Sequence, residues 1–583
     1  MDEITGKIKS WLSKYYLLAT FIIITLVTGI SLFIQIKARA NFIYGDTAFH
    51  YNRFYDLYRQ IKTGNFNYFQ AIYGFNESGR MINAVYGPGF AFFNAMLLFI
   101  CQSWFSYQIL TDFLINLIAG FGFIHLSRKL NLNIFVSYIM MIIFLSTGYI
   151  PVWNLGNQLM SWGAAITPWI FAEAMNWIQR TTKQVKAGKL AILMAIVAQI
   201  HNLTLLIVAV ALVIFFLIGL LHSKEKVVFL RNIGLSILIF LCLSANVIGG
   251  LLVLKQSQIT MPQSVSLLVN VLSLHKFYSI RTGLSLVLLL LVFVQVVVAL
   301  LVLRKKSKLN LLFAIMGAAF LFLGTRLFPW QIMQNIFPQL KDSFQAPFRF
   351  ILIAYPLIFI GYGLATSILL KEKHILGKIM LSLATIAMIF FMVGHVKTIR
   401  ENVANYNNDT TVIGNSWPYK VTKNRPKIRV AMHSKDKSEF LKLYVNAESD
   451  YLPASSSQNA GLLYGKEVID REKLFKHQVL KNGAMQLSWY SKKSQKTQLP
   501  FVMYRQSQLI LNGKETKYQL GQLHVPTVTA KKGKNIAVLS FKTPVWFVIA
   551  FWITIISWIL IIGYLIYKSV HKRRLFLLKL TWQ

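Results

Sequence analysis

The chain has 583 residues, of which 55% are hydrophobic and only 14% are charged, and its mean hydropathy is +0.52. A soluble protein of this length would be far more polar, and several apolar runs reach the roughly 20 residues that a helix needs to cross a bilayer core. A formal net charge of +41 would suggest nucleic acid as the partner of a soluble chain. Here the basic residues lie mostly beside apolar runs and in one long polar segment. We therefore expect membrane lipids and anionic envelope polymers as partners, and no nucleic acid.

The first candidate span is an apolar run at 17–34. It is longer than the roughly 7–15 apolar residues of a signal peptide, although the small residues at 38–40 imitate a cleavage site. Lys37 and Arg39 crowd that stretch. We therefore expect a first span that is retained in the protein.

Basic clusters on short loops mark the cytoplasmic side of a multi-pass membrane protein. The apolar segments between such clusters lie at 107–126, 132–150, 158–178, 190–221, 232–252, 283–303, 310–323, 349–369, 379–394 and 544–567. The block at 190–221 is long enough for two short crossings, which we expect to turn at His201. The pattern predicts a polytopic α-helical protein of the cell membrane, with about 12–13 transmembrane helices and cytoplasmic N- and C-termini. If 41–85 is outside and Arg128 is inside, the apolar segments 86–101 and 107–126 cannot both cross the membrane. We expect 86–101 to dip into the membrane and return or to lie partly in its interface; the alternative is that one basic cluster is misplaced, in which case 86–101 could span the membrane.

In this topology the most polar connections fall on the outer face, and the longest of them, 395–543, has its own pattern. After a mixed stretch it contains alternating runs such as "QLPFVMYRQSQLILNGK", separated by "NG" and "KKGK" turns, which is typical of β-structure. We expect a transmembrane domain at 1–394 with an outer loop at 37–85, an extracytoplasmic β-rich domain at 395–543, and a final transmembrane helix with a cytoplasmic tail at 544–583.

The stretch "GDTAFHYNRFYDLYRQIKTGNF" at 45–66 follows the first span and mixes charged with aromatic residues. If a helix begins at Asp46, then Asp46, His50 and Arg53 lie on one face. An adjoining apolar stripe at the membrane surface would consist of Phe54, Leu57 and Ile61. The alternative is a capping aspartate on an interfacial amphipathic helix. The i, i+4 spacing of the acid and the imidazole also suits a divalent metal, but no third ligand is identifiable, so we predict no metal site and no cofactor.

Four more residues are candidate substrate contacts. Tyr86 is the first residue of "YGPGF". A helix start near Pro88 would by itself explain this motif, so a substrate contact is not required. His201 lies in an apolar block and is either a turn residue or a substrate contact. Arg326 and Arg349 flank an irregular outer loop; a planar guanidinium suits a phosphate, whereas a lone interfacial arginine often only extends toward water.

The succession of "GDTAFHYNRFYDLYRQIKTGNF", "YGPGF", "IHNLT" and "FQAPFRF" resembles the YfhO-type membrane proteins of Gram-positive bacteria, which belong to the GT-C glycosyltransferase superfamily. Towards the carboxyl end, "YLPA" at 451–454 and "KKGKNIAVLSFKTP" at 531–544, followed by a final span, are similar too. The resemblance therefore covers nearly the whole chain. This chain departs from the YfhO-type pattern in two ways. It lacks a "DxD" pair, and "QAPFRF" replaces a more aromatic form of that motif.

This resemblance implies a glycosyltransferase that takes a sugar from a polyprenyl-phosphate carrier on the outer face of the membrane. The acceptor would be a cell-envelope polymer such as lipoteichoic or wall teichoic acid. Asp46 matches the position of the general base of such enzymes. The residues that would then bind substrate are His50, Arg53, Tyr86, His201, Arg326 and Arg349.

Two other classes of protein compete with this interpretation. A transporter or flippase of a lipid-linked glycan usually carries ionisable groups near mid-membrane. Here Asp112 and Glu173 are the acids within predicted spans, and a structural partner would explain each of them. The polar clusters instead crowd the outer face, which favours an enzyme. A non-catalytic envelope scaffold, whose basic β-domain binds anionic polymer, would leave Asp46 dispensable.

Overall fold

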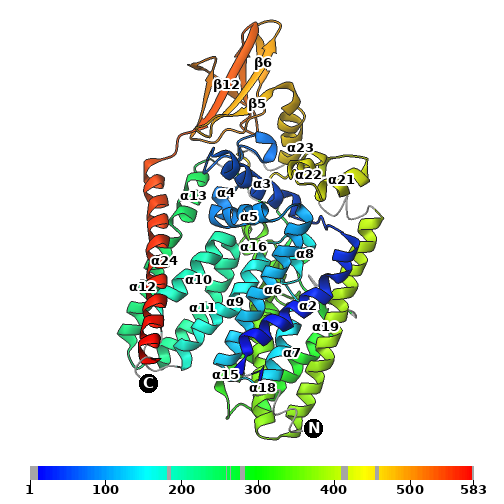
Figure 1. Ribbon diagram of the computed structural model, residues 1–583, viewed down its shortest axis with the longest axis vertical. Coiled ribbons are helices and arrows are strands. Elements are labelled where there is room, and N and C mark those ends of the chain that lie inside the picture. The colour runs from blue at the N-terminus through cyan, green and yellow to red at the C-terminus, as the bar shows by residue number, and fades with distance from the viewer. Residues whose placement is uncertain are drawn as a thin grey trace.

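The computed structural model shows a bundle of α-helices with a β-rich region at one end (Figure 1). The described residues are 11–12, 14–179, 185–257, 259–260, 262, 264–275, 283–408, 418–453 and 459–580. Helix α24 descends from the β-rich region along the side of the bundle, so the C-terminus lies at the opposite end of the molecule, as does the N-terminus (Figure 1).

The first half of the chain is helical. Its helices are α2 (Tyr16–Ala38), α3 (Thr47–Thr63), α4 (Asn83–Tyr86), α5 (Pro88–Ile100), α6 (Trp104–Lys129), α7 (Ile134–Leu145), α8 (Val152–Gly156), α9 (Met160–Gln179), α10 (Ala187–Ile200), α11 (Asn202–His222), α12 (Lys226–Leu243) and α13 (Ala245–Lys255). The remaining helices of the bundle are α14 (Leu286–Val297), α15 (Lys308–Leu323), α16 (Trp330–Ile336), α17 (Leu340–Ser343), α18 (Ile351–Lys371), α19 (Ile375–Asn407) and α24 (Val545–Leu580).

Among the described residues, seven helices are long and apolar enough to cross a membrane. These are Tyr16–Ala38, Trp104–Lys129, Asn202–His222, Lys226–Leu243, Pro347–Lys371, Ile375–Asn407 and Val545–His571. Shorter apolar helices accompany them. One is α5 (Pro88–Ile100), which falls in the segment 86–101, for which the sequence does not decide whether it spans the membrane. At 1.5 Å per residue, a helix of 11–17 residues is only about 17–26 Å long. The multi-pass architecture is thus confirmed, while the count of about 12–13 crossings stays a prediction.

Two breaks divide the apolar segments of the middle bundle. The break expected near His201 is confirmed, because α10 ends at Ile200 and α11 begins at Asn202. The segment 232–252, expected to be continuous, is also divided, between α12 and α13 at Ser244. This second break allows Asn246 to pair with its surroundings: its backbone N–H donates to the Thr554 hydroxyl at 2.9 Å.

The carboxy-terminal region begins later than predicted and is mixed before it becomes β-rich. Helix α19 continues to Asn407, so the expected boundary between 394 and 395 falls inside it. The mixed part contains β3 (Pro418–Val421), α21 (Arg425–Met432), α22 (Ser438–Leu443), β4 (Tyr444–Asn446) and α23 (Ala460–Tyr464).

The predicted β-rich region is confirmed. Its strands are β5 (Lys476–Val479), β6 (Met485–Ser491), β7 (Gln495–Gln498), β8 (Ser507–Leu511), β9 (Lys514–Glu515), β10 (Gln519–Leu520), β11 (Pro526–Ala530) and β12 (Gly533–Phe541). They form an antiparallel five-stranded sheet in the order β5-β6-β12-β8-β9 and a three-stranded sheet in the order β10-β11-β7. Alternating burial along β8 and β11 places Leu509, Leu511 and Val528 in a shared core. This is the pattern of a strand with one solvated face.

Helix α3 is buried in protein rather than lying on a membrane surface. Phe54 is 0% exposed and Leu57 is 2% exposed. The ring of Phe54 contacts the rings of Phe90 in α5 and Tyr107 in α6, with centroids 6.2 and 6.1 Å apart. The expected placement of this stripe at a membrane surface is therefore wrong, because the stripe faces neighbouring helices. Helix α3 itself lies beneath the β-rich region (Figure 1).

Residues 37–85, which keep the name outer loop from the topology that the sequence predicts, are joined to the carboxy-terminal region by direct hydrogen bonds. Asn67 Nδ2 donates to the Gly483 carbonyl at 3.1 Å, and the Val502 N–H donates to the Ser78 carbonyl at 2.8 Å. The Met81 N–H donates to the Tyr504 hydroxyl at 3.1 Å. Segments 400 residues apart thus form one body at this end of the bundle.

Candidate active site

Asp46 occupies the N-cap position of α3, but its side chain does not cap the helix. The turn before it is made by Gly45 at φ +45°, and by Thr47, whose hydroxyl donates to the Tyr44 carbonyl at 2.7 Å. Asp46 is half-buried. The explanation of Asp46 as a side-chain cap of α3 is therefore wrong.

One and two turns further along α3, His50 and Arg53 form a buried pair. Arg53 is 0% and His50 is 2% exposed. Arg53 Nη1 lies 3.1 Å from His50 Nδ1, and Arg53 Nε donates to Asn83 Oδ1 at 3.1 Å. Burial lowers the pKa of Arg53 to about 10, so the side chain is still a cation at neutral pH.

The imidazole of this pair is neutral, and the guanidinium has unused hydrogen-bonding capacity. Burial first, and then the charge of Arg53, holds the pKa of His50 well below its ordinary value. Arg53 Nη2 is buried and has no hydrogen-bond partner among the described residues. A buried cation with an unsatisfied donor is suited to an anionic group of a ligand.

Tyr86 joins this pair to two other parts of the chain. The guanidinium of Arg53 lies 4.6 Å from the centroid of the Tyr86 ring. The ring of His201 stacks on that of Tyr86, with centroids 6.2 Å apart, and the Tyr86 hydroxyl lies 3.3 Å from that of Tyr451. The turn at Gly87 (φ +75°) brings the tyrosine there. The predicted residues of three separate segments therefore meet.

The two predicted arginines of the late outer loop differ in their placement. Arg349 donates through Nη1 to the Phe344 carbonyl and through Nη2 to Gln345 Oε1 at 3.4 Å. It also acts on the cluster: burial raises the pKa of Tyr451, and the charge of Arg349 opposes this shift. Arg326 is exposed on the turn after α15.

The sequence analysis missed two acids, Glu448 and Asp450, which the carboxy-terminal region brings to Asp46. Burial raises the pKa of Glu448 well above its ordinary value, and the charges of Asp450 and Asp46 raise it further. Burial raises the pKa of Asp450 to about 6, against the lowering effect of Arg80. The "ESD" triplet directly before "YLPA" was the available signal. Only the fold shows that it faces a residue 400 positions earlier.

The segment that carries these acids is held by several specific contacts. Arg80 is 1% exposed and donates through Nη2 to the Asp450 carbonyl at 2.7 Å. Thr260 donates through its hydroxyl to the Ser449 carbonyl at 2.7 Å. Tyr451 has φ +63°, a strained conformation for a non-glycine residue. Strain maintained by surrounding contacts is common at functional sites.

The two acids of the predicted spans have structural partners. Glu173 forms an ion pair with Lys189 at 2.5 Å and accepts from Asn176 Nδ2 at 3.1 Å. Asp112 accepts from Asn116 at its backbone carbonyl, at 2.8 Å, and at its carboxylate, at 3.4 Å. Neither acid belongs to the cluster around Tyr86.

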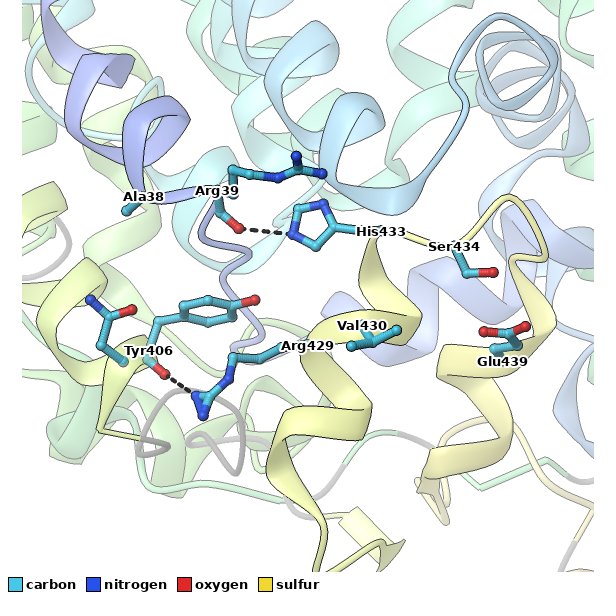
Figure 2. A pocket seen from close by; sticks show the side chains of 9 residues that line it. Ala38, Arg39, Tyr406, Arg429, Val430, His433, Ser434 and Glu439 are labelled. Atoms are coloured by element: carbon cyan, nitrogen blue, oxygen red, sulfur yellow. Dashed lines mark hydrogen bonds between the residues drawn. The ribbon is translucent and has the colours of Figure 1, made fainter.

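An open pocket of about 600 Å³ lies elsewhere, where the ends of α2 and α19 meet α21 (Figure 2). His433 Nε2 donates to the Arg39 carbonyl at 2.9 Å, and Arg429 Nη1 donates to the Tyr406 carbonyl at 3.1 Å. Glu439, the carboxylate of this pocket, is exposed. None of the predicted site residues lines it, so we place the candidate active site at Asp46.

Within the described part of the chain, no group of three or more His, Cys, Asp or Glu side chains is arranged to hold a metal ion. No protein-family model and no curated protein matches the chain. Among solved structures, the oligosaccharyltransferase of Archaeoglobus fulgidus in its apo form matches with 14% identity and a TM-score of 0.36. The match covers 77% of this chain and 62% of that chain, so this chain spans less than two thirds of that protein. The YfhO-type resemblance remains a prediction.

Proposed function

We propose that the protein is a membrane glycosyltransferase of the GT-C type that transfers a sugar from a polyprenyl-phosphate donor to a cell-envelope polymer. The observation that carries this proposal is the position of Asp46, a half-buried carboxylate at the start of α3, one and two helical turns before the buried pair of His50 and Arg53. It lies close enough to Tyr86 and Asp450 to affect their pKa, and Tyr86 in turn contacts the buried cation Arg53. A base and a phosphate-binding cation are the two groups that such a transfer requires.

In the proposed reaction, Asp46 accepts the proton of an acceptor hydroxyl as the hydroxyl oxygen attacks the anomeric carbon of the sugar. The bond from that carbon to the phosphate oxygen breaks, and the electron pair leaves with polyprenyl phosphate. Positioned general-base catalysis contributes roughly 10²–10⁴-fold. Arg53 and Arg349 are placed to stabilise the leaving phosphate, while His50, Tyr86 and His201 shape the site between them.

We propose that the site faces the outside of the cell. The basic loops of the sequence favour cytoplasmic termini, and both termini lie at the end of the molecule opposite the β-rich region (Figure 1). Residues 395–543 would then be extracytoplasmic. A net charge of +41 suits an anionic acceptor such as a teichoic acid. Arg326, which is exposed, would contact the acceptor or lipid head groups rather than the reacting atoms.

The proposal is tested by Asp46→Asn. We expect a loss of sugar transfer of at least about 100-fold, because the amide cannot accept the proton, with unchanged membrane insertion and thermal unfolding. The assay uses purified protein, radiolabelled polyprenyl-phosphate hexoses and teichoic acid. Glu401→Gln is the matched control, because its carboxylate lies on the surface of α19 with 60% of its side chain exposed. Transfer by Asp46→Asn at the rate of the unmodified protein would contradict the assignment of the base.

A further inference from the structure

Residues 157–162, which lead from the end of α8 into the first turn of α9, contain an unusual concentration of unsatisfied polar groups. Asn157 is 0% exposed, and neither its amide oxygen nor its amide nitrogen has a partner among the described residues. The same holds for the hydroxyl of Ser161, which is 0% exposed, and for the indole N–H of Trp162, which is 2% exposed. Buried polar groups are almost always hydrogen-bonded, so a cluster of exceptions requires an explanation.

This segment contacts every early segment that contributes to the candidate active site. A Cβ added to Gly45, the residue before Asp46, would lie 3.8 Å from the Gly156 carbonyl oxygen. The ring of Trp162 lies 5.3 Å from that of Phe90, in the "YGPGF" turn that opens with Tyr86.

The third contact is with the break at His201. A Cβ added to Gly163 would lie 2.3 Å from Thr204 Cγ2, and the Thr204 hydroxyl is hydrogen-bonded to His201 at 2.9 Å. The unsatisfied groups therefore lie among the elements that carry Asp46, Tyr86 and His201, rather than in a remote part of the bundle.

The chemistry of these groups selects a neutral, hydroxylated ligand. An amide offers one acceptor and two donors, a serine hydroxyl offers both functions, and an indole offers one donor. Sugar hydroxyl groups donate and accept in the same way. A phosphate would instead call for cations, such as Arg53 and Arg349.

We propose that Asn157, Ser161 and Trp162 form the subsite that binds the hydroxyl groups of the transferred sugar. This inference rests on the proposed function, because it assigns the neutral part of the donor to one wall of the site. In this arrangement the phosphate faces the arginines and the sugar faces the 157–162 segment, with Asp46 between them.

Asn157 allows a test that separates ligand binding from backbone conformation. It adopts φ +49°, which asparagine tolerates and glycine adopts without strain. Asn157→Gly therefore keeps the turn and removes the amide. Asn131→Gly is the matched control, because Asn131 also has a left-handed conformation, at φ +57°, but is exposed in the turn after α6. Trp162→Phe provides a second variant, which keeps an aromatic ring but removes the N–H donor together with part of the ring volume.

We would measure binding of methyl glycosides of glucose, galactose, mannose and N-acetylglucosamine to the full chain in detergent, by saturation-transfer NMR. At least one glycoside should bind the unmodified protein and Asn131→Gly, and Asn157→Gly should weaken that binding about tenfold. Trp162→Phe should weaken it less. Binding unaffected by Asn157→Gly, or no binding to the unmodified protein, would overturn the proposal and indicate that these groups are satisfied by structural water only.

The transfer assay distinguishes this inference from the proposed function. If Asp46→Asn abolishes transfer while Asn157→Gly leaves the KM for the donor unchanged, the glycosyltransferase assignment stands and the sugar subsite is wrong. If no transfer is found with any donor, but Asn157→Gly still loses glycoside binding, the sugar subsite stands and the proposed reaction is wrong.

Discussion

Two aspartates of one helical segment illustrate how local contacts decide the role of a residue. Asp56 Oδ1 accepts the backbone N–H groups of Ile72, Tyr73 and Gly74 at 2.8, 2.7 and 3.0 Å, and Oδ2 accepts from Gln60 at 2.7 Å. It is 1% exposed. A carboxylate surrounded in this way holds the outer loop together, so Asp56 is structural. Asp46, ten residues earlier, is half-buried and raises the pKa of Glu448 and Asp450.

Also at the scale of single residues, the raised pKa of Asp450 predicts that the stability of the protein depends on pH. Its pKa is raised by burial to about 6 in the folded protein, against about 3.9 for an unperturbed aspartate. The folded state therefore holds a proton that the unfolded chain has already released, so this residue favours folding below pH 4 and the advantage is lost as the pH rises toward 6.

We therefore expect Asp450→Asn to raise the melting temperature at pH 7 and to flatten its decline between pH 4 and 6. The measurement is thermal unfolding of the detergent-solubilised protein across this range. Asp436→Asn is the control, because Asp436 is exposed and its pKa is lowered rather than raised. Equal slopes for the unmodified protein and Asp450→Asn would contradict the raised pKa of this carboxyl group.

At the scale of elements, the break between α10 and α11 has two separable roles. His201 Nδ1 accepts the Thr204 N–H at 3.3 Å and thereby caps α11, while its ring stacks on Tyr86. Because asparagine is a strong N-cap and alanine is not, His201→Asn should keep the stability of the protein, whereas His201→Ala should lose about 1 kcal/mol.

Both variants remove the imidazole from the candidate active site, so both should reduce sugar transfer. Thermal unfolding and the transfer assay, applied to the same preparations, measure the two effects separately. A His201→Asn variant with full transfer activity would show that capping is the whole role of His201.

Sequence patterns predicted elements where a local signal existed. The polar pair at His201 and Asn202 interrupts an apolar run, and this break was expected. The break at Ser244 was not expected, because a serine in a continuous apolar run is only a weak signal. Its cause is tertiary, since Asn246 pairs with Thr554 in α24 and with Gln199 in α10.

The candidate site, too, was predictable only where a local sequence pattern existed. Helical spacing on α3 places His50 and Arg53 on one face, and their pairing at 3.1 Å follows from that spacing. Glu448 and Asp450 reach Asp46 only through the packing of the carboxy-terminal region on the outer loop. No periodicity in the chain encodes contacts at that sequence separation.

At the scale of the whole molecule, the outer loop and the β-rich region depend on each other. The turn between β5 and β6 shows this most clearly: Gly483 is buried with φ +76°, and a Cβ added to it would lie 2.3 Å from the Phe66 carbonyl oxygen. This backbone contact cannot relax by a side-chain rotation. The β-rich region therefore closes against the outer loop only because residue 483 is a glycine.

Gly483→Ala should accordingly separate the two regions. Gly513→Ala is its matched control, because Gly513 has φ +81° but no atom within 4 Å of its added Cβ. Both variants should lose about 1–2 kcal/mol from the left-handed conformation, but only Gly483→Ala should also disrupt the interface. We expect faster amide hydrogen exchange in both 66–82 and 476–504, together with reduced transfer, since Asp450 would no longer be held near Asp46. If faster exchange were confined to the β5–β6 turn and transfer activity were unchanged, the β-rich region would not contribute to the active site.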